Sequence, residues 1–504
     1  MRMKKSAALA AALLVFASSA YAYENSYAGY SLKDKDPYVR IETNKIYAYS
    51  SAQSSDIAKI VKETEKNTKK NAADTSFLDK YQGMNVVNYY TAEEMKEIIG
   101  EDFSSSYFAA EYEKLALLER SQLSLKTVPT PLLDMEKYKA FENKGNLVVQ
   151  NQLLKDNAAK LTPTIHLEKI TGQKAITLKY LFKQMNTLVN MDVTLMSVND
   201  RLYMLTNVNL DSSLYAPKAA QAKEQKSDTK ENTSLKEAMS IENVNAASVP
   251  AANMNKFAKQ HTQLVKSIKF FEPAQTAAPL TFTDATMGKK IVLPDDWYYS
   301  QLKYQIGAKT NATITAAGSV PELQQAANAM DINGLFNIIA DNVDKENVAA
   351  TDTAEATGAQ AEKEAFYKMA SKYKEEYTKA LRYVNSGFIT TSFKVEDNDL
   401  KQMLETPISN QLVANVMLRD GLKRLKAFSN ENFALKDYRY KLDFTREKAN
   451  INIAADFMAL KEFDFNSKLF LGCKGDIASM MFFVKKAGFE PDKALAEQID
   501  TWQF

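Results

Sequence analysis

Residue types that carry catalysis or bind metals are scarce in this sequence. Its 504 residues include two histidines and one cysteine, the side chains on which zinc and haem sites draw most. The patterns H-E-x-x-H, C-x-x-C and G-x-S-x-G do not occur, and the 15 glycines form no glycine-rich phosphate loop. We therefore expect no metal ion and no cofactor.

One histidine lies at strand spacing from a carboxylate. In Ile165-His166-Leu167-Glu168 the alternation places His166 and Glu168 on one face of a strand and the two apolar residues on the other. Such a pair could act in acid–base chemistry or bind a metal, but an ordinary half-exposed strand gives the same pattern. The second histidine, His261, falls in a predicted helix, where we expect an ordinary surface or boundary residue.

A second candidate is the run Asp295-Asp296-Trp297-Tyr298-Tyr299. Aromatic rings beside carboxylates suit sugar or amine ligands, and paired acids can cleave glycosidic bonds. The simpler interpretation is a turn at a strand end, with the two aspartates solvated and Trp297 in the core. We treat these five residues, with His166 and Glu168, as a candidate ligand or partner surface and assign no catalytic residue.

The first 22 residues have the organisation of a secretory signal peptide. Three basic residues precede an apolar run at 7–17, which is followed by the cleavage pattern Ala20-Tyr21-Ala22. The residue directly after that pattern is Tyr23 and not a cysteine, which argues against a lipid anchor, and no later stretch approaches the length of a membrane span. We expect a chain that is exported to the periplasm or the extracellular space.

Charge argues against nucleic acid as a partner. Without the three basic residues of the signal peptide, 61 Lys and Arg face 62 Asp and Glu. A net charge of about −1 offers no basic surface, which nucleic-acid binding requires.

Two long segments share one pattern of apolar and polar residues, and this pattern predicts the fold. Residues 176–205 and 451–484 each contain three apolar runs. In the first segment a polar break at Asn190-Met191-Asp192 and a turn at Asn199-Asp200 separate the runs. This pattern predicts two three-strand antiparallel meanders. We expect an α+β protein of two related domains, each an antiparallel sheet packed with helices.

The domain boundaries follow changes in composition. Two stretches are poor in apolar residues and cannot offset the entropy cost of ordering, so we predict a disordered insertion at 212–253 and a low-complexity insertion at 348–362. The predicted organisation is a signal peptide at 1–22, a tyrosine-rich N-terminal arm and tether at 23–75, a first domain at 76–272 and a second domain at 280–504.

Parts of the chain resemble PsbP-like α/β/α sandwich domains. The resemblance rests on Leu-Pro-x-x-Trp within residues 291–297 and on the closing strand at 267–271, with a weaker echo at 501–504. It implies a duplicated sandwich fold and a role as a non-catalytic accessory or binding module near a membrane.

From these observations we expect an exported, non-catalytic binding or accessory module of the bacterial cell envelope. Its partner would be an envelope protein or a surface polymer. Two alternatives stay open: a secreted hydrolase that uses carboxylates such as Asp295 and Asp296, and a small-ligand binder that uses a cleft between the domains. The sequence does not indicate the oligomeric state.

Overall fold

The computed structural model places most of the chain in β-strands. It describes residues 22–33, 39–50, 83–121, 130–142, 161–184, 187–211, 242–283, 290–306, 310–322, 378–394, 433–444, 449–459, 465–474 and 477–502, with single residues of helical segments between 325 and 427. Several predictions fall outside the described residues: residues 1–21 of the signal peptide, the tether at 51–75, the insertion at 348–362, and the insertion at 212–253 up to residue 241.

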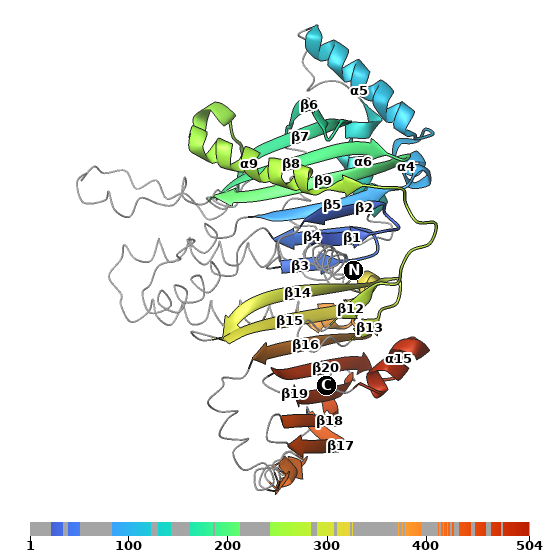
Figure 1. Cartoon of the computed structure of the whole chain (residues 1–504), viewed down its shortest axis with the longest axis vertical. Coiled ribbons are helices and arrows are strands. Elements are labelled where there is room, and N and C mark those ends of the chain that lie inside the picture. The colour runs from blue at the N-terminus through green and yellow to red at the C-terminus, as the bar shows by residue number, and fades with distance from the viewer. Residues whose placement is uncertain are drawn as a thin grey trace, which may run out of the picture.

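A single antiparallel sheet of 15 strands runs through the described part of the chain (Figure 1). Its order is β10-β7-β8-β9-β5-β4-β3-β14-β15-β16-β20-β19-β18-β17, with β6 paired to β7. The strands are β3 (Val39–Glu42), β4 (Ile46–Ser50), β5 (Met84–Tyr90), β6 (Thr164–Ile170), β7 (Gln173–Gln184), β8 (Thr187–Val198), β9 (Arg201–Asp211), β10 (Glu242–Asn243), β14 (Trp297–Ile306), β15 (Thr310–Ser319), β16 (Ser386–Lys394), β17 (Phe433–Phe444), β18 (Ala449–Ala459), β19 (Phe465–Lys474) and β20 (Ile477–Lys486).

The expectation of two helix-packed α+β domains is therefore wrong. The predicted N-terminal arm supplies β3 and β4, which lie in the middle of the sheet. β4 pairs with β5 of the first half, and β3 pairs with β14 of the second half. The backbone groups of both halves thus join one ladder of hydrogen bonds instead of ending at two separate sheet edges.

Both predicted meanders are present, as β7-β8-β9 and β18-β19-β20. The turn at Asn199-Asp200 is confirmed, with φ angles of 51° and 54° at the two residues, which is the conformation that suits a tight hairpin. The predicted polar break at 190–192 is wrong, because these residues lie in the middle of β8.

Helices and two small sheets cover the faces of the large sheet. On one face, α4 (Ala92–Ile99), α5 (Ser105–Arg120) and α6 (Met135–Glu142) pack on β7, β8 and β9. On the other face lie α9 (Ala251–Ser267), a three-strand sheet, a two-strand sheet and α15 (Lys493–Asp500). The small sheets consist of β1 (Ala22–Asn25), β2 (Tyr30–Lys33) and β11 (Lys269–Phe270), and of β12 (Thr281–Thr283) and β13 (Lys290–Val292).

Local sequence signals account for the ends of several helices. α4 begins with a capping box: Thr91 Oγ1 accepts from the Glu94 backbone, and the Glu94 carboxylate accepts from the Thr91 backbone. α15 runs to Asp500, and the two described residues of the echo at 501–504, Thr501 and Trp502, lie outside any strand. Trp502 behind it is buried in the core of the second half. Among the described residues, no helix is long and apolar enough to cross a membrane.

The short pairing of β3 with β14 makes a testable prediction about cooperativity. Ile41 lies between Ser300 of β14 and Ala48 of β4, so Ile41→Pro removes a ladder hydrogen bond in a central strand. We expect this variant to unfold in two separate calorimetric transitions and to become sensitive to proteolysis between the halves. Ile41→Val is the matched control, and one unchanged transition in the proline variant would contradict the prediction.

Candidate functional site

Polar side chains cross the first half of the large sheet on the face that α9 covers. In antiparallel pairs, residues that lie directly opposite share a face, and Lys179, Asp192, Asn207 and Asn85 are successive partners on β7, β8, β9 and β5. The pairs Thr177–Thr194 and Asn190–Asn209 lie beside them. We call this set the covered polar patch: Asn85, Thr177, Lys179, Asn190, Asp192, Thr194, Asn207 and Asn209.

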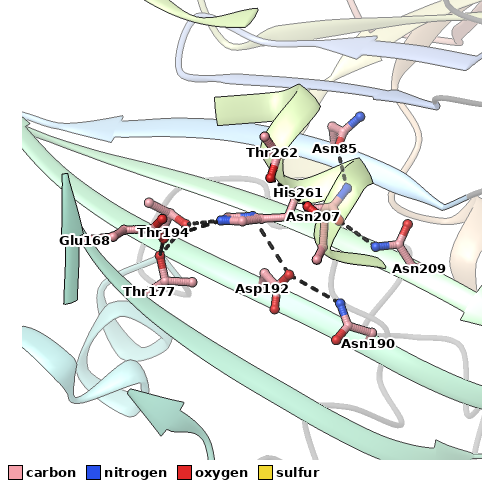
Figure 2. Close-up of polar contacts among 11 residues, drawn as sticks. Asn85, Glu168, Thr177, Asn190, Asp192, Thr194, Asn207, Asn209, His261 and Thr262 are labelled. Atoms are coloured by element: carbon pink, nitrogen blue, oxygen red, sulfur yellow. Dashed lines mark hydrogen bonds and ion pairs between the residues drawn. The ribbon is translucent and has the colours of Figure 1, made fainter. Parts of the chain in front are cut away.

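His261 of α9 points down onto the covered polar patch (Figure 2). Its Nε2 atom lies 3.4 Å from the Thr194 hydroxyl and 3.7 Å from Glu168 Oε1. Its Nδ1 atom lies 3.9 Å from Asp192 Oδ2. The imidazole therefore sits between two carboxylates that come from β6 and β8, and it is 4% exposed.

The patch is sealed at both ends by apolar side chains of the same helix. Phe257 packs with Leu188 on one side of His261, and Leu264 and Val265 pack with the tyrosine-rich core on the other. Thr177 and Thr194 are 0% exposed. A hydroxyl beside a histidine suggests a nucleophile, but no substrate could reach these hydroxyls while α9 is in place.

Hydrogen bonds link most of the patch, and a few polar atoms are left over. Asn207 Nδ2 donates to Asn85 Oδ1 at 2.6 Å and Asn209 Nδ2 donates to Asn207 Oδ1 at 2.5 Å. Among the described residues, Asp192 Oδ1, Asn209 Oδ1 and His261 Nδ1 have no hydrogen-bond partner. Each such atom lowers the stability of the fold by about 1–3 kcal/mol in a buried site. The patch therefore stabilises the protein less than an apolar core would.

Burial and hydrogen bonding move the two carboxylates in opposite directions. The His261 imidazole lowers the pKa of Glu168 to about 2. Burial acts in the opposite direction, whereas a hydrogen bond of 2.7 Å from the Thr177 hydroxyl also lowers this pKa. Burial raises the pKa of Asp192, because the surrounding sheet and helix disfavour its charge. Glu168 is thus held as a carboxylate at the rim of the patch.

The structure places His166 and Glu168 on the predicted face, with Ile165 and Leu167 packed on the opposite one. Glu168 contacts His261 and not His166. Partial burial and Lys179 lower the pKa of His166, which is exposed at the end of the patch.

The sequence interpretation of His261 as a surface or boundary residue is wrong, because the residue is buried at the centre of the helix's inner face. The sequence does carry a signal for this position, because Phe257, His261 and Leu264 follow the spacing of an apolar helical stripe.

A pocket of about 630 Å³ lies at the junction of the two halves, which we call the seam pocket. Its floor is the pairing of β3 with β14, where Arg40 lies opposite Gln301 and Glu42 lies opposite Tyr299. One wall is the β1 strand and the turn after it, at 23–27, and the other wall is the segment 277–283, which contains β12. Every wall therefore comes from a different part of the chain.

Arg40 is held in the floor by aromatic rings and a carboxylate. Its guanidinium lies 5.6, 5.3 and 5.7 Å from the ring centres of Tyr23, Tyr47 and Tyr299. Its Nη2 donates to Glu42 Oε2 at 2.9 Å, and the Tyr299 hydroxyl donates to the same oxygen at 2.6 Å. Burial lowers the pKa of Arg40, but Tyr299, Tyr47 and Glu42 raise it by more, so Arg40 stays charged.

The structure places the side chains of one candidate run in different surroundings: solvent, core and pocket. This run is Asp295-Asp296-Trp297-Tyr298-Tyr299. Asp295 and Asp296 lie exposed in the turn before β14, and Trp297 is buried in the core. Tyr298 lies on the opposite face of β14, where burial raises its pKa. Only Tyr299 lines the seam pocket. Asp295 touches its edge indirectly, because its carbonyl accepts from Asn44 at 2.8 Å.

In the described ranges, no cluster of three or more His, Cys, Asp or Glu could hold a metal ion. The two sites thus offer different chemistry: a sealed acid–imidazole–acid contact and an open polar pocket.

Comparisons with known proteins do not identify a family. No family model matches the chain, and no curated protein matches it. A solved structure from Bacteroides thetaiotaomicron VPI-5482 aligns with 73% of this chain and 82% of its own, at 6% identity and a TM-score of 0.20. A likeness at that score supports no argument about fold or function.

The sealed contact predicts energetic coupling between helix and sheet. In His261→Leu the side-chain volume is kept, but Asp192 loses its imidazole neighbour, so we expect unfolding free energy to fall by about 1–3 kcal/mol. Adding Asp192→Val should restore most of that loss, because an apolar pair removes the stranded carboxylate. Chemical denaturation of the two single variants and the double variant measures the coupling.

Gln263→Leu is the matched control for this cycle, since Gln263 is exposed on the same helix. It should leave stability within about 0.5 kcal/mol of the unchanged protein. Strict additivity of the two single variants in the double variant would show that the imidazole and the carboxylate do not interact.

Glu168 predicts a stability difference that depends on pH. Its pKa of about 2 in the folded protein lies below the unfolded value of about 4.3, so the carboxylate stabilises the fold above about pH 5 and loses this effect as the pH falls toward 2. The melting temperature of Glu168→Gln should therefore lie below that of the unchanged protein at pH 7, and the gap should close in acid. A gap that is constant with pH, or equal to that of the exposed control Glu490→Gln, would contradict this assignment.

Proposed function

We propose that this protein is an exported, non-catalytic binding or accessory module of the bacterial cell envelope and that the seam pocket is its contact site. The observation that carries the proposal is the pocket itself: about 630 Å³, within the range of ligand sites, with its polar floor built where the two halves meet. A surface polymer or an envelope protein segment could enter it from solvent.

The hydrolase alternative receives less support from the geometry. Asp295 and Asp296 are exposed in a turn and do not line the seam pocket. The other acids near a potential proton acceptor, Glu168 and Asp192, flank a histidine beneath α9. Glu24 and Glu42 both line the seam pocket, but Glu42 Oε2 already accepts from Arg40 and Tyr299, so the pocket does not offer the free pair of carboxylates that glycoside hydrolysis requires.

The proposal predicts binding that depends on a pocket side chain. Gln301 lies in the pocket floor, and its backbone pairing survives substitution by alanine, so Gln301→Ala should keep the fold while weakening binding at least tenfold. The measurement is co-sedimentation of the mature chain, residues 23–504, with isolated cell walls and membranes of the bacterium that produces it.

Gln173→Ala at the exposed start of β7 is the matched control and should bind as the unchanged protein does. Equal co-sedimentation of both variants would place the contact outside the seam pocket, and no co-sedimentation at all would reject the envelope role.

A further inference from the structure

The charges in the floor of the seam pocket are compensated within the protein. The Arg40 guanidinium is paired with Glu42, whose Oε2 atom also accepts from Tyr299, and three aromatic rings surround the guanidinium. A charged ligand group that binds Arg40 or Glu42 would have to compete with these contacts of 2.6–2.9 Å. The floor therefore offers a ligand no unpaired charge, and the exposed Glu24 carboxylate on the wall of the pocket can accept hydrogen bonds from ligand hydroxyl groups.

Several other polar groups in the pocket are uncommitted. The Glu24 carboxylate and the Gln301 amide make no hydrogen bond to any other side chain or backbone group that the structure describes, and Asn44 uses its Nδ2 but not its Oδ1. Together these groups offer acceptors and donors at separate points of the pocket. A hydroxyl group, which both donates and accepts, can satisfy either kind.

The position of the pocket favours a polymer ligand that crosses the pocket over a small molecule that is enclosed by it. It lies between the two small cover sheets, with Tyr27 on one wall and Thr281 and Thr283 on the other. Ligands that are buried on all sides need a closed cavity, whereas a polymer needs a floor and two walls that it can cross.

We propose that the seam pocket binds an uncharged, hydroxyl-rich chain, that is, a segment of a neutral oligosaccharide. Gln301 and Glu24 bind ring hydroxyls, and the Arg40–Glu42–Tyr299 set forms a rigid polar floor beneath the sugar. This inference rests on the proposed function, since it names the ligand class of the same pocket.

The test is isothermal titration of the mature chain with defined probes of two kinds. The first set is neutral tetrasaccharides of glucose, N-acetylglucosamine, xylose and mannose. The second is small charged molecules: citrate, glutamate, lysine and AMP. We expect at least one tetrasaccharide to bind with micromolar to millimolar Kd and the charged set to give no heat.

Variants separate contact residues from folding effects. Gln301→Ala and Glu24→Gln should weaken tetrasaccharide binding at least tenfold and leave the melting temperature unchanged, while the exposed control Gln173→Ala should do neither. Equal weakening by the control would overturn the assignment.

The two probe sets also separate this inference from the proposed function. Binding of a charged probe that is lost in Gln301→Ala would overturn the neutral-sugar assignment while keeping the pocket as the contact site. If neither probe set gives heat and co-sedimentation does not depend on Gln301, both the neutral-sugar assignment and the proposed contact site are overturned.

Discussion

The pairing of β3 with β14 is the constraint on which the whole arrangement depends. Four residue pairs, from Tyr299↔Glu42 to Leu302↔Val39, join strands that are about 260 positions apart in sequence. Because β3 is short and central, the N-terminal chain has to enter the sheet between two halves that each contain a complete meander. Such long-range pairing has a large loop-closure cost. It also fixes the distance between the cover sheets, and that gap is the seam pocket.

The covered polar patch applies a second constraint, on the position of α9. Apolar contacts alone would let the helix slide, because Phe257, Leu264 and Val265 meet broad apolar surfaces. The contacts of His261 with Thr194 and the flanking carboxylates are directional and exist at one register only. Buried polar groups of this kind reduce stability relative to a well-packed apolar core, but they can fix one arrangement among several. We infer that the patch serves the specificity of docking at the expense of stability.

Local patterns in the sequence predicted much of the secondary structure. The two meanders follow from apolar runs and turn residues, which act over a few positions. Local patterns do not predict which strand pairs with each edge of a sheet, because any half-apolar strand can pair with any other edge. The sequence therefore predicts two domains with a boundary between residues 272 and 280, whereas the structure joins the halves through the pairing of β3 with β14. Asn190 and Asp192 were misread for a related reason: a polar residue inside a strand looks like a break unless the histidine that covers it is known.

Local sequence patterns do not predict the seam pocket. Its lining comes from four separate segments, 23–27, 40–44, 277–283 and 299–301, and among the residues named from the sequence only Tyr299 belongs to it. Tyr299 was selected for its neighbours, yet its role comes from Glu42, which becomes its partner only through the strand pairing. Because the walls belong to opposite halves, a ligand that touches both adds contacts to a junction held by four backbone pairs. Binding and the integrity of the junction are then thermodynamically linked: whatever binds the joined form stabilises it, and the same strands both hold the sheet together and form the site.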